Sequence, residues 1–88
     1  MDLKLVISKA GHDKGQSYVV IGEDTDFYTL VNGTTKPLSK PKRKKKIHSQ
    51  IVKNLSDEIN KIAESVNELD DLAIKRILKV YNRRNKNV

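Results

Sequence analysis

The sequence predicts an α+β protein in which a small closed or nearly closed β-barrel, residues 1–54, precedes a C-terminal helical hairpin, residues 55–88. The first part holds short β-branched segments separated by glycine-containing turns, a pattern typical of small barrels. The second part places its apolar residues at helical spacing. With 88 residues, a single Phe and no Trp, the chain can bury only a thin core. We therefore expect one small domain, or a smaller one with an appended element.

Five segments of the first part have the composition of strands: residues 4–9, 17–21, 27–31, 34–36 and 46–52. Glycine-bounded turns separate the first three of them. Asn32-Gly33 is a strong hairpin signal because both residues tolerate a positive φ, so the segment after it is expected to return antiparallel to the third strand. Pro37 then ends that fourth strand.

The second part carries start signals for two helices. Ser56 is the expected N-cap of the first, because two acidic residues follow it and favour a helix N-terminus. The second helix is expected to begin at Asp70 or Asp71. The polar side of this second helix carries Lys75, Arg76, Lys79, Asn82 and Arg83. A polar tail, residues 85–88, is expected to fray.

Positive charge is concentrated in one short segment. Residues 1–35, 36–54 and 55–88 carry charges of −2, +8 and +1, which together make the net charge of +7. The run Lys40–Lys46 alone holds six of the eighteen basic residues, and we predict a basic loop over residues 39–46. Such a concentration attracts polyanions, because neutralised phosphates release condensed counterions. A solvated loop without a partner is the alternative interpretation.

The sequence carries no signal for catalysis, a metal or a cofactor. Cysteine is absent, which removes thiolate ligands and thiol chemistry. His12 and His48 have no second His or Cys at metal-ligand spacing. Glu23, Asp24 and Asp26 are interpreted as a solvated acidic turn. Since no run of about 18 apolar residues occurs, we expect a soluble cytoplasmic protein that is not an enzyme and has no membrane contact and no small-molecule substrate.

We expect the two aromatic residues of the third strand to differ in burial. Phe27 and Tyr28 are neighbours and must point to opposite faces of the sheet, so only one of them can be buried. The other is a candidate for stacking on a base or for covering apolar surface. Tyr81 falls within the apolar arc of the second helix and is expected in the core.

Residues 6–15, which read VISKAGHDKG and are followed by Tyr18-Val19-Val20, resemble the KOW motif of RNA-binding small β-barrels. The chain is similar to KOW-type large-subunit ribosomal proteins of archaea and eukaryotes and to their short bacterial relatives. Gly11, Lys14 and Gly15 match the motif, whereas Tyr18 stands where the general pattern has another glycine. The resemblance implies an SH3-like barrel whose glycine loop between the first two strands lies against RNA.

These observations together predict an RNA-binding protein, with ribosomal RNA and the ribosome as the expected partner. The expected contacts are Lys9, Gly11, His12, Lys14, Gly15, Lys36, Lys40, Lys42, Arg43, Lys44, Lys45, Lys46 and His48. Because a lysine acts as a point charge, we expect contact with the RNA backbone more than reading of bases. Two alternatives remain open: a protein–protein adaptor that uses the C-terminal helices to dock a translation or transcription partner, and a non-specific DNA binder.

Overall fold

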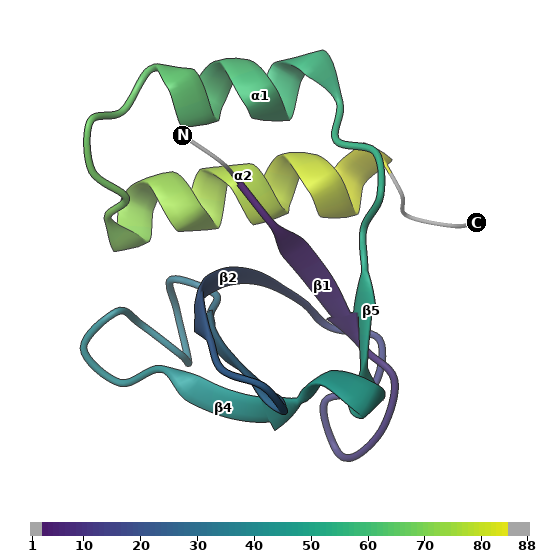
Figure 1. Ribbon diagram of the computed structural model, residues 1–88. Helices are drawn as coiled ribbons and strands as arrows, with labels where there is room; N and C mark the ends of the chain where they lie inside the picture. The colour runs from purple at the N-terminus through teal and green to yellow at the C-terminus, as the bar shows by residue number, and fades with distance from the viewer. Residues whose placement is uncertain (1–2, 85–88) are drawn as a thin grey trace.

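The computed structural model describes residues 3–84, which form a five-stranded antiparallel sheet followed by two helices (Figure 1). The elements are β1 (Leu5–Ser8), β2 (Ser17–Glu23), β3 (Phe27–Val31), β4 (Lys42–Lys45), the 3-10 helix η1 (Lys46–His48), β5 (Ser49–Ile51), α1 (Asp57–Glu64) and α2 (Asp71–Arg84). The predicted tail, residues 85–88, lies outside the described residues.

The sheet is strongly curled but not closed. Its strand order is β4-β3-β2-β1-β5, so β4 and β5 are the two outer strands. Only the three residues of η1 separate these strands along the chain. The sheet must therefore roll until its two edges approach each other, as Figure 1 shows. No ladder joins β4 to β5 among residues 3–84, so the described strands form an open sheet.

The concave face of this sheet encloses a small apolar cluster. Val6 lies opposite Tyr18 in the β1–β2 ladder, and directly opposed residues share one face of a sheet. Tyr28 and Leu30 of β3 join them, with Val20 and Ile51 packed alongside. This cluster fills the inside of the curl.

The convex face packs against the helices. Alternation along each strand turns Leu5, Val19 and Val31 away from the concave cluster. They form one core with the apolar residues of α1 and α2, which are Ile59, Ile62, Ile74, Ile77, Leu78 and Val80. Tyr81 packs against this core, as predicted. Because strand and helix residues share this core, the helices are part of the same fold as the sheet.

The helix starts follow the predicted signals. The Ser56 side chain accepts a hydrogen bond from the Ile59 backbone N–H at 3.2 Å and caps α1. The Asp70 carboxylate accepts one from the Ala73 N–H at 2.8 Å at the start of α2. Both expected helices are thus confirmed.

The predicted hairpin at Asn32-Gly33 is wrong, and residues 34–36 form no strand. The Asn32 side-chain oxygen accepts hydrogen bonds from the backbone N–H groups of Thr34 and Lys36, which closes a local loop in place of a two-residue turn. Gly33, with a φ of +80°, lies directly against the start of α2. The Leu38 N–H donates to the Asp71 carboxylate at 2.8 Å. This segment therefore docks on α2.

The basic segment also differs from the predicted loop, because Lys42–Lys45 form strand β4. β4 pairs antiparallel with β3, placing Lys42 opposite Leu30 and Lys44 opposite Tyr28. Lysine has a low intrinsic preference for strands, so this strand depends on its partners. The fifth predicted strand is shorter than expected, Ser49–Ile51, because η1 takes up its first residues.

The contact between Gly33 and α2 leads to a stability prediction. A Cβ at Gly33 would lie 2.5 Å from the Asp71 carbonyl oxygen, whereas a Cβ at Gly15, which has a similar positive φ of +90°, would meet nothing within 4 Å. Both Ala variants pay about 1–2 kcal/mol for the left-handed backbone. Gly33→Ala adds a backbone clash, and we expect its loss of unfolding free energy to exceed that of Gly15→Ala by at least about 1 kcal/mol. Urea unfolding measures both, and equal losses would contradict the docking of this loop.

Candidate nucleic-acid interface

The glycine loop between β1 and β2 is tightly turned. Gly11 and Gly15 both have a φ of +90°, a backbone conformation that residues with a Cβ rarely adopt. The Gly15 N–H donates to the Ser8 carbonyl at 2.9 Å, and the Gln16 N–H donates to the Asp13 carbonyl at 2.9 Å. These bonds close the loop and direct the Asp13 side chain inward.

The Asp13 carboxylate is the centre of a buried hydrogen-bond network, with the residue only 8% exposed. It accepts four hydrogen bonds, from the Ser8 hydroxyl at 2.8 Å, the Tyr18 hydroxyl at 2.7 Å, the Lys42 ammonium at 2.7 Å and the Lys44 ammonium at 3.1 Å. A buried charge needs such partners, because burial without them costs several kcal/mol. One carboxylate therefore joins the glycine loop, β2 and β4.

The two lysines that reach Asp13 are thereby held inside the structure. Lys44 also donates to the Ala10 carbonyl at 2.9 Å, and its side chain is only 11% exposed. The Lys42 side chain is 29% exposed, and its ammonium lies over the Tyr18 ring. Both were expected to neutralise phosphates. The structure gives each of them an intramolecular partner.

A second acidic residue, Glu23, holds Lys46 on the same face as Lys42 and Lys44. Glu23 accepts hydrogen bonds from the Lys46 and Lys4 ammonium groups, each at 2.7 Å. Both ammonium groups lie within 6 Å of the centre of the Tyr28 ring. The sequence predicted a solvated acidic turn at Glu23, whereas the structure shows this residue in ion pairs with two lysines. Every second residue from position 42 to position 46 is therefore a lysine that meets an acidic residue.

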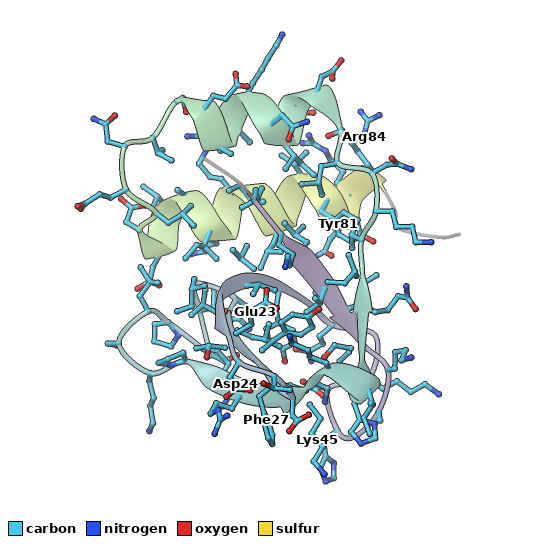
Figure 2. The ribbon with its side chains drawn as sticks, viewed as in Figure 1. Glu23, Asp24, Phe27, Lys45, Tyr81 and Arg84 are labelled. Carbon is cyan, nitrogen blue, oxygen red and sulfur yellow. The ribbon has the colours of Figure 1, made fainter. Side chains whose placement is uncertain are left out.

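The alternate residues of β4 point outward. The Arg43 guanidinium stacks 4.2 Å from the centre of the Phe27 ring and pairs with Asp24. Lys45 lies opposite Phe27 in the β3–β4 ladder. Figure 2 shows Asp24, Phe27 and Lys45 at the end of the sheet away from the helices. Phe27 is half-buried and Tyr28 is buried, as expected of two neighbours in one strand.

The structure brings the glycine loop and the end of the basic run together. The Lys9 N–H donates to the His48 carbonyl at 2.8 Å, and Lys44 bridges β4 to the loop. Lys9, Lys14 and Lys45 are exposed at this end and make no ion pair within residues 3–84. The two histidines there, His12 and His48, are exposed as well. We call the loop 9–15 together with residues 43–48 the basic end.

Two of the expected contacts lie elsewhere. Lys40 precedes β4, whereas Lys45 ends it, so the strand separates them. Lys36 belongs to the segment that Asn32 closes beside α2. Lys36 and Lys40, both expected to contact RNA, therefore lie outside the basic end.

Burial and hydrogen bonding act on the pKa of Asp13 in opposite directions. Burial raises it, but the hydrogen bonds from its four donors outweigh burial and hold the pKa of this carboxyl well below its usual 3.8. Burial together with the Asp13 charge raises the pKa of the Tyr18 hydroxyl well above 10. Asp13 is thus ionised and Tyr18 neutral at physiological pH. In the same way, hydrogen bonds from Lys4 and Lys46 lower the pKa of Glu23 to about 2.

Within residues 3–84, no group of three or more His, Cys, Asp or Glu side chains is arranged to hold a metal ion. None of the helices in that range has the length and apolar character needed to cross a membrane. Comparison of the chain with models of known protein families finds no match, and comparison with curated proteins finds no significantly similar sequence.

Removal of the Asp13 charge should be strongly destabilising. Asp13→Asn leaves two inward-facing ammonium groups without their anion, and we expect a loss of about 3 kcal/mol of unfolding free energy. Asp24→Asn is the matched control, since Asp24 pairs with Arg43 at the exposed surface and should cost under about 1 kcal/mol. Urea unfolding followed by circular dichroism compares the two. Equally small losses would show that Asp13 does not anchor the loop to β4.

The stability of the protein should also fall in acid. The folded-state pKa of Asp13 lies below its unfolded value of 3.8, so its contribution to stability is complete above about pH 5 and is lost progressively as the pH falls from 3.8 through the lower folded-state pKa. Glu23, with a pKa of about 2, contributes with the same sign. We expect the urea midpoint to decrease between about pH 5 and about pH 2, and Asp13→Asn to flatten that decrease. A wild-type midpoint independent of pH over this range is the contrary result.

Proposed function

We propose that this protein binds RNA through its basic end, with structured ribosomal RNA as the favoured target. We further propose that the curled sheet is an SH3-like barrel of the KOW type, whose edges approach each other through η1. The observation that carries the proposal is the attachment of the Gly11–Gly15 loop to β4 through Asp13. This attachment holds an exposed glycine backbone beside exposed cations that have no acidic partner among the described residues.

The division of the lysines explains how such a site would work. Lys42, Lys44 and Lys46 stabilise the scaffold, so their charges are partly compensated by Asp13 and Glu23. The outward charges on Lys9, Lys14 and Lys45 remain for phosphates, and Arg43 adds a fourth if a phosphate replaces its exposed partner Asp24. The glycines permit close approach of an RNA backbone. Point charges of this kind position a backbone and do not read bases.

The adaptor alternative has less support. The apolar faces of α1 and α2 are already buried in one shared core, in which α1 packs on α2 and α2 packs on the sheet. Leu72, 67% exposed, is the large hydrophobic residue that the described helices leave in solvent. A single exposed leucine is ordinary on a protein surface and does not mark a docking face. For the same reason, deletion of residues 55–88 would expose Leu5, Val19 and Val31, so point variants are the cleaner test.

The proposal predicts a specific dependence of RNA affinity on salt. Four cations on phosphates give a slope of log affinity against log salt of about −3 to −4. Lys14→Gln combined with Lys45→Gln should make that slope shallower by about 1.4 to 1.8. Lys53→Gln combined with Lys61→Gln removes the same charge at exposed positions outside the basic end and should change it less. Filter binding with transcribed large-subunit ribosomal RNA measures the slopes.

Two results of that measurement would contradict the proposal. A nearly flat salt response of the wild-type protein would remove the phosphate mechanism. Equal affinity for ribosomal RNA and for a random-sequence DNA duplex at matched salt would favour the non-specific DNA alternative instead.

A further inference from the structure

A groove of about 830 Å³ runs between α2 and the sheet, next to the basic end. Its helix wall carries Lys75, Lys79 and Arg83, and its opposite wall carries Gln16 and Asn32. The buried Leu78, also on α2, lines the groove and gives it an apolar floor. None of the basic residues on this wall belongs to the run Lys40–Lys46, so the groove is a second cationic feature of the molecule.

The two walls are held together by contacts at both ends of α2. Near the helix C-terminus, the Ser17 hydroxyl donates to the Asn82 side-chain oxygen at 2.8 Å. Near its N-terminus, Gly33 packs against the Asp71 backbone and the Leu38 N–H donates to the Asp71 carboxylate. These contacts fix the width of the groove before any ligand arrives, which lowers the ordering cost of binding.

The charge of the groove is positive and largely uncompensated. Three of its lining residues are basic and none is acidic. Lys75 and Lys79 form no ion pair within the part of the chain that the structure describes, and Arg83 has one exposed pair with Glu58 at 3.2 Å. The three cations follow one another at intervals of four residues, about 6 Å apart along the helix axis. One row of charges at that interval matches successive phosphates of a single nucleic-acid strand.

We infer that this groove binds a single-stranded segment of RNA that continues from the Gly11–Gly15 loop. The inference rests on the proposed RNA binding at the basic end. Gly15 belongs both to that loop and to the lining of the groove, so a strand leaving the loop enters the groove directly. Its phosphates lie along Lys75, Lys79 and Arg83.

The opposite wall explains why a single strand is favoured over a duplex. A strand whose phosphates face α2 turns its riboses and bases toward Gln16, Asn32 and the apolar floor at Leu78. The Gln16 amide can both donate to and accept from a ribose 2′-hydroxyl or a base edge, whereas the Asn32 amide is held in its own loop by Thr34, Thr35 and Lys36. The Asn82 oxygen is occupied by Ser17, so its NH₂ group is the one left for the ligand. In a duplex the base edges are paired and cannot enter such a groove.

The test compares two double variants of α2. Lys75→Gln with Lys79→Gln removes two charges from the groove, whereas Arg76→Gln with Arg84→Gln removes two exposed charges of the same helix that do not line it. The probes are a ribosomal RNA hairpin with a single-stranded 3′ extension and the same hairpin without the extension. All four residues are exposed, and circular dichroism verifies that both variants keep the fold.

We expect the extension to increase wild-type affinity roughly tenfold and to steepen the salt slope by about 2.1, which is about 0.7 for each of the three groove cations on a single strand. The groove variant, which retains Arg83, should lose about two thirds of that change in slope, and the control variant should keep it. If the wild-type protein binds the bare hairpin but the extension adds nothing, or if both variants lose the gain equally, the groove inference is wrong and the proposed function stands. If the wild-type protein binds neither probe in a salt-dependent way, the proposed function fails, and the groove inference fails with it.

Discussion

The ion pairs of Asp13 with Lys42 and Lys44 are the contacts on which the basic end depends. In these pairs a carboxylate of the glycine loop meets two ammonium groups of the outer strand β4. The hydroxyl groups of Ser8 and Tyr18 donate to the same carboxylate. Because each partner would be costly to bury alone, the loop and β4 are stable in this arrangement only together. Two lysines of the chain's most basic segment therefore stabilise the fold through ion pairs inside the protein.

Side chains alternate between the two faces along β4, so the basic residues of this strand are divided into an inward and an outward set. The inward residues of β4 meet Asp13, Lys46 of η1 continues the alternation and meets Glu23, and the outward residues of β4 meet solvent, Phe27 and the exposed Asp24. An outer strand rich in charge also resists pairing with another sheet edge, which protects an open sheet from edge-to-edge association. The helices complete the fold by covering the convex face, so that the exposed glycine loop and the α2 groove lie on a scaffold with a single shared core.

The sequence predicted those elements whose signals are local. Three apolar strand segments and the Ser56 cap are visible in runs of a few residues, and both helices were found. β4 could not be found in this way, because four consecutive basic residues have no intrinsic preference for a strand and pair with β3 only when distant acids receive them. The hairpin predicted at Asn32-Gly33 was wrong for a similar reason. Gly33 permits a close contact with α2, which lies far along the chain. The period-two spacing of Lys42, Lys44 and Lys46, together with the acid inside the glycine loop, is the signal that could have revealed β4.

Asp13 and Glu23 divide the lysines into an inward, structural set and an outward, exposed set. Lysine reactivity measures this directly. Under brief acetylation of the native protein, followed by mass spectrometry, Lys42 and Lys44 should react much more slowly than Lys14 and Lys45. Added ribosomal RNA should then protect Lys14 and Lys45. Uniform reactivity along the whole run from Lys40 to Lys46 would contradict the account.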